Sequence, residues 1–223
     1  MQTIIDQKDA FSDGEGDVWF ARNKGNLMNK GLMQDLDCIK NSIGPYKNQI
    51  NSILEIGCSN GRKLEELSSF FDAFGYGLDP SSAAINDAKA RVASNAKDLH
   101  FQVGKSVALP YADAKFDLVF FGFCLYLVDR DEIFRTIAEA DRVLKKGGFL
   151  VILDFDPAKQ HKRPYIHKEG LFSFKTSYAD FFLNNGHYYL VAKESFSHAA
   201  HYFSINSDER VSTCILFKEL DAY

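Results

Sequence analysis

Apolar and polar positions alternate between two periods along the middle of the chain. Short apolar runs of about five residues are followed by stretches in which apolar residues recur every three or four positions, as in amphipathic helices. This alternation predicts a mostly parallel sheet covered by helices, which is the doubly wound α/β class. The predicted strands cover residues 52–57, 74–79, 99–104, 117–123 and 149–155, and the predicted helices cover residues 61–71, 81–95, 131–145 and 177–184.

Further elements are predicted on either side of this core. Residues 27–42 predict a helix ended by Gly44-Pro45, after a polar stretch that indicates an ordered lead-in. The helix over 131–145 is expected to end at Gly147. After a polar connection over 154–178, two β-rich runs at 187–197 and 210–218 predict an antiparallel terminal hairpin.

The first predicted strand ends in a glycine-rich turn, since Ser52 to Gly61 read SILEIGCSNG. Glycines at a strand-to-helix turn let a ligand lie against bare backbone, and the helix N-terminus favours an anionic group. Asp79 closes the next strand, where a carboxylate can accept hydrogen bonds from a ribose diol. Together they predict a pocket for an adenosine-bearing cofactor. A dinucleotide fingerprint would need glycine where Ser59 and Arg62 stand, which disfavours NAD.

Four stretches between about residue 50 and residue 155 resemble, in order, motifs of the class I S-adenosylmethionine-dependent methyltransferases. The glycine turn resembles the family's E/D-x-G-x-G-x-G motif, with Ser59 at the middle glycine. The other three stretches are Asp79-Pro80-Ser81, Leu109-Pro110-Tyr111 followed by Phe116-Asp117, and Arg142-Val143-Leu144-Lys145-Lys146-Gly147-Gly148. The resemblance implies a Rossmann-like, seven-stranded, mostly parallel sheet and S-adenosyl-L-methionine as the cofactor.

The same resemblance implies which residues contact the cofactor. Family members often place an acidic residue after the glycine that matches Gly104, where it meets the adenine amino group. Here Lys105 stands at that position and cannot accept a hydrogen bond, so Ser106 or the backbone is expected to do so. The expected cofactor-binding residues are Trp19, Arg22, Glu55, Gly57, Ser59, Gly61, Asp79, Pro80, Ser106, Val107 and Phe121.

The run Trp19-Phe20-Ala21-Arg22-Asn23 is unusually aromatic for a solvated lead-in. One hypothesis is that it folds over the cofactor and that Arg22 pairs with the methionyl carboxylate. The alternative is a hydrophobic anchor for the first helix. We expect one methyltransferase domain over 1–223, with 1–45 as lead-in and cofactor-covering helix and 154–178 on the substrate side.

The connection over 154–178 is locally basic and aromatic, although the chain carries a net charge of −4. It is either a solvated surface loop or a lid that recognises an anionic acceptor. His161 and His167 are the preferred general bases, since histidine titrates near neutrality, and Asp154 is the next candidate. Tyr126 could donate to the acceptor or simply pack, and His198 and His201 could reach the same mouth. The expected substrate-binding residues are Arg163, Tyr165, Lys168 and Tyr178.

Composition narrows the class of protein. The chain has 223 residues, of which 46% are hydrophobic, and a net charge of −4 gives no global basic field for nucleic acid. Four scattered cysteines without a C-x-x-C pair indicate reduced thiols in a cytoplasmic protein. No signal peptide, membrane span or metal site is expected, and the chain could be a monomer or a homodimer.

The sequence therefore predicts a methyltransferase for a small, anionic acceptor that is phosphorylated, carboxylated or a nucleotide sugar. O-methylation is favoured, in a setting such as surface-polysaccharide biosynthesis. A protein or RNA acceptor is the alternative, and a partner subunit that binds the cofactor without turnover also fits. Gly57-Cys58-Ser59-Asn60-Gly61 is in addition a G-x-S-x-G sequence, which would make Ser59 the nucleophile of a serine hydrolase.

Overall fold

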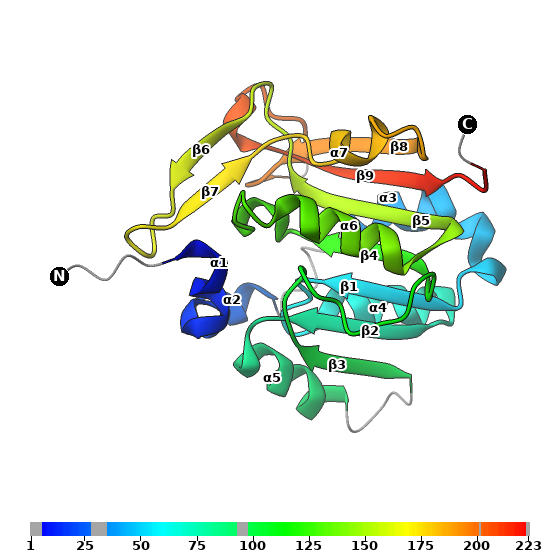
Figure 1. The fold of residues 1–223 in the computed structure, drawn as a ribbon, viewed down its shortest axis with the longest axis horizontal. Coiled ribbons are helices and arrows are strands. Elements are labelled where there is room, and N and C mark those ends of the chain that lie inside the picture. Colours follow the sequence, from blue (N-terminus) through cyan, green and yellow to red (C-terminus); the bar gives the residue numbers. More distant parts are fainter. Residues whose placement is uncertain (1–5, 28–34, 93–97, 201, 222–223) are drawn as a thin grey trace.

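The computed structural model describes residues 6–27, 35–92, 98–200 and 202–221. A seven-stranded sheet runs through the molecule in the order β3-β2-β1-β4-β5-β9-β8 (Figure 1). The five strands from β3 to β5 are parallel, and β9 and β8 are antiparallel to their neighbours. The Rossmann-like sheet with an antiparallel terminal hairpin is thus confirmed. The strands of this sheet are β1 Ser52–Ile56, β2 Phe74–Asp79, β3 Leu99–Val103, β4 Phe116–Gly122, β5 Leu144–Phe155, β8 Tyr188–Ser197 and β9 Arg210–Lys218.

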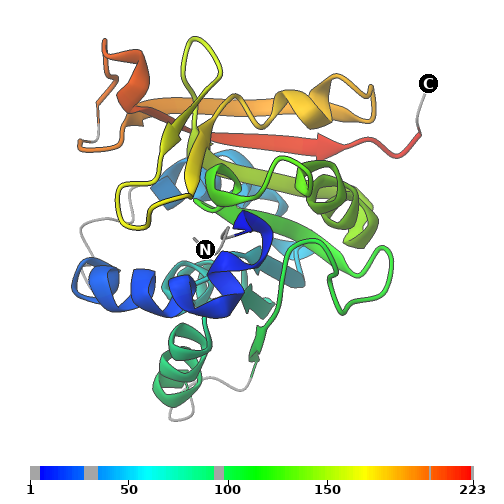
Figure 2. The same cartoon turned by 60° about the vertical axis from the view of Figure 1, so that its left-hand side comes forward.

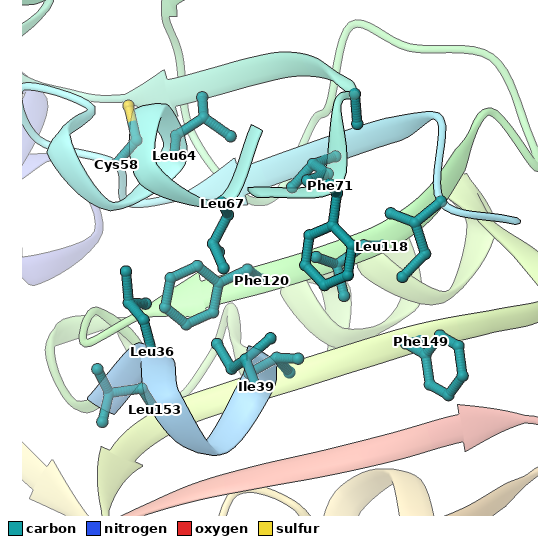
Figure 3. Close-up of a cluster of buried hydrophobic side chains, with 14 of the residues drawn as sticks. Leu36, Ile39, Cys58, Leu64, Leu67, Phe71, Leu118, Phe120, Phe149 and Leu153 are labelled. Carbon is teal, nitrogen blue, oxygen red and sulfur yellow. The ribbon is translucent and has the colours of Figure 1, made fainter. Parts of the chain in front are cut away.

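Helices cover both faces of the sheet because successive strand residues point to opposite sides. On β4, Leu118 and Phe120 join one apolar cluster, whereas Val119 and Phe121 join the other. Figure 3 shows the first cluster, in which Leu36 and Ile39 of one helix and Leu64, Leu67 and Phe71 of another meet β4 and β5. The helices of this face are α3 Asp35–Ile43, α4 Arg62–Phe71 and α5 Ser82–Val92, and those of the other face are α6 Ile133–Val143 and α7 Asp180–Leu183.

The amino-terminal segment, for which the sequence indicated an ordered lead-in, is helical. It consists of α1 Gln7–Ala10, the π-helical turn η1 Phe11–Glu15 and α2 Gly16–Leu27. Gly14 lies inside this run with φ +121°, a left-handed conformation that glycine adopts without strain. The predicted helix over 27–42 is observed from Asp35 and continues into the 3-10 helix η3 Gly44–Gln49, while 28–34 lie outside the described residues.

One sequence-based expectation about the carboxyl-terminal half is wrong in its boundary, and another is incomplete. The helix predicted over 131–145 ends at Val143, because Leu144 already pairs with Phe116 and starts β5, and Gly147, the predicted helix stop, provides a left-handed bend within that strand at φ +76°. The connection over 154–178 is partly regular, since β6 His161–Pro164 and β7 Phe172–Lys175 form a two-stranded antiparallel sheet. Its tip lies beside the amino-terminal helices (Figure 2). The 3-10 turns η4 Leu125–Leu127 and η5 Ser207–Glu209 complete the elements.

Candidate functional site

A cleft opens where β1, β2 and β4 end and the amino-terminal helices cross over them. It contains about 930 Å³ of empty space, which includes the open mouth and the solvent there. This position, outside the carboxyl ends of parallel strands, is where open α/β sheets bind ligands. The wall from the strand ends comprises Ile56, Gly57, Leu78, Asp79, Pro80, Gly104, Lys105, Ser106, Gly122, Phe123 and Cys124. The wall from the amino-terminal helices and from the segment after β4 comprises Gln7, Lys8, Phe11, Ser12, Gly16, Trp19, Leu127, Val128, Asp129 and Glu132.

Asp79 brings a carboxylate to this cleft at the end of β2. Its two oxygens accept hydrogen bonds from the backbone N–H groups of Ser59 and Ser81, each at 2.8 Å. Burial raises the pKa of Asp79 to about 6, although the two backbone hydrogen bonds favour its ionised form. Each oxygen keeps a second lone pair, so this carboxylate can accept further hydrogen bonds from a ligand's hydroxyl groups.

The glycine turn is built on three left-handed residues. Gly57, Ser59 and Gly61 have φ values of +74°, +48° and +71°. Serine is tolerated in the middle because its backbone N–H is fixed by Asp79, which over-determines an otherwise unfavourable conformation. A Cβ atom at Gly61 would overlap the Phe101 ring, so glycine is required there for packing as well. The Ser59 hydroxyl is buried and has no hydrogen-bond partner within the described residues.

Glu55 lies beneath the turn and does not line the cleft. Its side chain is only 2% exposed, and burial raises its pKa to about 8. A Cβ atom at Gly122 would overlap this carboxyl group, which explains why β4 ends in glycine. Glu55 therefore supports the turn from inside the fold and makes no direct contact with the cleft.

The segment after β3 presents Lys105 and Ser106 to the cleft, whereas Val107 is half-buried outside it. The Lys105 ammonium pairs with the Asp9 carboxylate and donates to the backbone carbonyl of Lys8, both on α1. Lys105 thus joins the strand wall to the amino-terminal wall. The hydroxyl groups of Ser106 and of Thr136 on α6 form a hydrogen bond of 2.9 Å.

The predicted amino-terminal contacts divide between two places. Trp19 lines the cleft, as does Phe11 from the same segment. Arg22 does not line it and instead donates to Glu15 and to the Tyr165 hydroxyl, both at 2.8 Å. Glu15 is 4% exposed, so Arg22 neutralises a buried carboxylate and ties α2 to the loop between β6 and β7.

The turn after β4 supplies Phe123, Cys124 and Leu127 to the cleft. Phe121 is fully buried in the core under α6 and does not reach it. Tyr126 is outside the lining and packs its ring on Phe123 and Phe155, with centroid distances of 5.2 Å to each. Burial raises the pKa of Tyr126 above its ordinary value.

Most of the predicted acceptor-side residues do not line the cleft. Asp154 is 2% exposed at the end of β5, and burial raises its pKa to about 7. Tyr178 is likewise buried, and its hydroxyl donates to the carbonyl of Phe174 at 2.5 Å. The remaining expected residues, His161, Arg163, Tyr165, His167 and Lys168, lie on the β6–β7 hairpin outside the lining, and Arg163 pairs with Asp208 of η5.

Sequence reasoning named Trp19 but missed the rest of the amino-terminal wall, above all Gln7. Its side-chain amide donates to the carbonyls of Leu127 and Phe172, at 3.1 and 2.8 Å, and accepts from the N–H of Phe172 at 2.9 Å. Gln7 thus joins α1, the turn after β4 and the hairpin. Only the aromatic run near Trp19 signalled in the sequence that this segment packs against the site.

Two further classes of feature are absent from the described part of the chain. No group of three or more His, Cys, Asp or Glu residues there is arranged to hold a metal ion. In the same ranges, no helix has both the length and the apolar character needed to cross a bilayer.

The central segment of the chain is similar in sequence to known methyltransferases. Residues 53–148 match the model of a family described as "Methyltransferase domain". An O-methyltransferase from Penicillium expansum is 30% identical over 105 residues, which are 46% of this chain and 37% of the relative. A demethylmenaquinone methyltransferase from Lactococcus lactis is 35% identical over 106 residues, 46% of this chain and 41% of the relative. The matched segment thus spans less than half the length of these relatives.

Solved structures share the fold across more of the chain. The 1,6-didemethyltoxoflavin N1-methyltransferase of Burkholderia thailandensis, crystallised with S-adenosylhomocysteine, aligns with a TM-score of 0.67 and 11% identity, covering 98% of this chain and 93% of that one. A SAM-dependent methyltransferase from Methanosarcina mazei aligns with a TM-score of 0.64 and 20% identity, covering 80% and 97%. The resemblance seen in the four sequence motifs is confirmed.

Proposed function

We propose a function from the premise that residues 53–148 carry the methyltransferase domain of a class I, S-adenosylmethionine-dependent enzyme. The chain is proposed to bind S-adenosyl-L-methionine in the cleft and to catalyse methyl transfer to a small molecule. The observation that carries this proposal is Asp79, a carboxylate held by two backbone N–H groups at the edge of a cleft beside a left-handed glycine turn.

The residues of the cleft fit such a cofactor. Asp79 would accept from the ribose hydroxyls. The Ser59 hydroxyl, which has no hydrogen-bond partner within the described residues, lies outside the lining, and its backbone N–H bonds to Asp79. Leu78, Leu127 and Val128 give apolar surface on which the adenine ring can pack. When bound, the cofactor supplies a methyl group on a sulfonium, which is reactive without help from a metal.

The protein's part in the reaction is to align the acceptor and to exclude water. Trp19, Phe11 and Phe123 line the cleft with aromatic surface suited to both tasks. Among the histidines of the described ranges, only His198 has its ring against a cleft-lining side chain, stacking on Phe123 at 5.4 Å. Partial burial lowers the pKa of His198, which leaves a neutral ring able to take a proton. We propose His198 as the general base in preference to His161 and His167.

The acceptor is proposed to be anionic and to present a hydroxyl group, as in a phosphorylated, carboxylated or nucleotide-linked sugar of surface-polysaccharide synthesis. The β6–β7 hairpin supports this, because it lies at the cleft mouth, where Gln7 bonds to Phe172. Its Lys162 and Lys168 have no ion-pair partner within the described residues, although Lys162 stacks over Phe172. Methylation of a hydroxyl agrees with the O-methyltransferase among the relatives.

Calorimetric titration with S-adenosylhomocysteine tests the cofactor. Micromolar binding by the wild type is expected, with a loss of at least tenfold in Asp79→Ala. Asp117→Ala is the matched control, since Asp117 also accepts from backbone N–H groups, those of Asn51 and Ser52, but at the opposite end of the sheet. Absence of binding by a folded wild type would refute the methyltransferase, and Ser59 would then be tested as a hydrolytic nucleophile.

Methyl transfer from labelled cofactor to a panel of small hydroxyl compounds tests the acceptor. Phosphorylated and carboxylated members are expected to react, and their neutral counterparts to react poorly. Lys162→Gln with Lys168→Gln should raise the KM for the anionic acceptor and leave the affinity for S-adenosylhomocysteine unchanged. Equal rates with neutral acceptors would contradict an anionic substrate, and turnover on protein or RNA alone would favour the macromolecular alternative.

A further inference from the structure

The carboxylate of Asp154 is enclosed where β5 ends and is tied to a neighbouring element. It accepts hydrogen bonds from the backbone N–H groups of Leu125 at 2.8 Å and Tyr126 at 3.3 Å, the first two residues of η4. A third bond comes from the N–H of Phe155 at 2.7 Å. All of these are contacts with backbone, and Asp154 is not among the residues that line the cleft.

We propose that Asp154 is a positioning residue: it fixes the turn formed by residues 123–127, which makes one wall of the cleft, and does not act on substrate itself. The proposal rests on the proposed function in so far as this cleft holds S-adenosylmethionine. It differs from the expectation drawn from the sequence, in which Asp154 was a candidate base.

The turn is a strained element that needs such support. Phe123 has φ +69°, a left-handed conformation that an aromatic residue adopts only when its surroundings impose it. Its N–H donates to the carbonyl of Leu153 at 2.9 Å, immediately before Asp154 in the chain. Phe123, Cys124 and Leu127 present their side chains to the cleft, so a shift of the turn would move all three at once.

The opposite end of the same turn is held by a cation. Arg130 donates to the backbone carbonyls of Leu125 at 3.0 Å and Val128 at 2.7 Å. The guanidinium is itself fixed by stacking over the rings of Phe174 and Tyr178. An anion therefore meets the N–H groups of η4 and a cation meets its carbonyls, the arrangement that stabilises the dipole of a helical turn.

The chemistry of the two groups suits an anchor. A charge-assisted hydrogen bond to backbone is stronger than a neutral one, and a buried carboxylate with three donors has no freedom to reach a substrate. Leu125 and Tyr126 both donate to Oδ2 of Asp154, whereas Phe155 donates to Oδ1, so an asparagine could keep both bonds to η4 with its single carbonyl oxygen. An alanine at 154 removes every acceptor, and Asp154→Ala should therefore release the turn while leaving the sheet in place.

The test compares Asp154→Ala with Asp117→Ala, which also removes a carboxylate bonded to two backbone N–H groups but lies far from the turn. Both variants are expected to lower the thermal midpoint. Only Asp154→Ala should weaken S-adenosylhomocysteine binding, by about tenfold, and speed hydrogen exchange at the Leu125 and Tyr126 amides by a similar factor. Equal affinities in the two variants, or an unchanged exchange rate at those amides, would overturn the proposal.

Arg130→Gln provides a second route if Asp154→Ala does not fold. It removes the cation from the carbonyl side of the same turn and should show the same pair of effects. Normal affinity and exchange in folded Arg130→Gln would count against the proposal. If the wild type fails to bind S-adenosylhomocysteine, the cofactor assignment is wrong, while the exchange measurement on the apoprotein still decides whether Asp154 holds the turn.

Discussion

Replacement of Gln7 by alanine is expected to open the amino-terminal wall of the cleft. The Gln7 side chain makes three hydrogen bonds to backbone groups of two other elements and is 8% exposed. A typical intramolecular hydrogen bond contributes about 1 kcal/mol, so losing all three removes about 3 kcal/mol from the closed arrangement. Because 1.4 kcal/mol corresponds to a factor of ten, local opening should become about a hundredfold more frequent.

Hydrogen exchange measures this opening directly. In Gln7→Ala, the amides of residues 7–10 and of Phe172 should exchange about a hundredfold faster, while amides in β1 and β4 stay protected. Release of S-adenosylhomocysteine should accelerate in parallel, since residues 6–27, which we call the covering segment, would move away from the cleft more often. The thermal midpoint should change little, because α1 packs at the margin of the sheet and not inside its core.

Two other variants test whether faster exchange comes from the lost hydrogen bonds or from shortening any side chain in this segment. Ser12→Ala also alters a cleft-lining side chain of this segment, but its hydroxyl bonds locally to the carbonyl of Asp9, so exchange should stay within about twofold of the wild type. Gln7→Glu keeps the shape but loses both donated bonds, and should behave like the alanine variant. Wild-type exchange at Phe172 in Gln7→Ala would show that these hydrogen bonds do not hold the segment closed.

Four further predictions concern the cleft and its surroundings. Affinity for S-adenosylhomocysteine should fall as the pH drops below about 6, because burial raises the pKa of Asp79 to about 6 and only the ionised carboxylate can accept from both ribose hydroxyls. Calorimetry across pH 5–8 measures this fall, which should be absent in Asp79→Asn. The same raised pKa means that ionising Asp79 subtracts from the free energy of unfolding as the pH rises from about 4 to 6. Gly61→Ala should destabilise the fold by about 2–4 kcal/mol through left-handed strain and overlap with Phe101. Urea unfolding should show that adding Phe101→Leu relieves part of this loss. If the free-energy changes of the two substitutions simply add, the overlap is excluded. Arg22→Ala should lower the thermal midpoint, because it leaves the Glu15 carboxylate buried without its cation. A large loss of cofactor affinity at unchanged stability would instead support the hypothesis that Arg22 pairs with the methionyl carboxylate.

Local chemistry explains why the central sheet could be predicted. The glycine turn, Asp79 and the alternating apolar runs each carry a periodic or positional signal, and β9 was predicted with both ends correct, as residues 210–218. The end of α6 was misjudged because Gly147 is a common helix stop, whereas here tertiary pairing of Leu144 with Phe116 ended the helix at Val143, two residues before the predicted end.

The walls of the cleft were less predictable because they depend on contacts between distant segments. Gln7 has no periodic neighbours, and its importance lies in bonds that span 120 and 165 residues of sequence. The four-residue strands of the hairpin are too short for a period to be detected, and Pro164 argued against a strand. Asp154 was correctly placed at the end of its strand, yet the sequence could not reveal that backbone donors of η4 enclose it.

The position of the covering segment has a consequence for how a ligand is retained. Six residues that line the cleft lie between Gln7 and Trp19, whereas the segment shared with other methyltransferases begins at residue 53. Substitutions in residues 6–27 can therefore change how long a ligand stays in the cleft, without altering the glycine turn or Asp79. Chimeras that exchange residues 6–27 between similar proteins would show how much of the ligand selectivity depends on this segment.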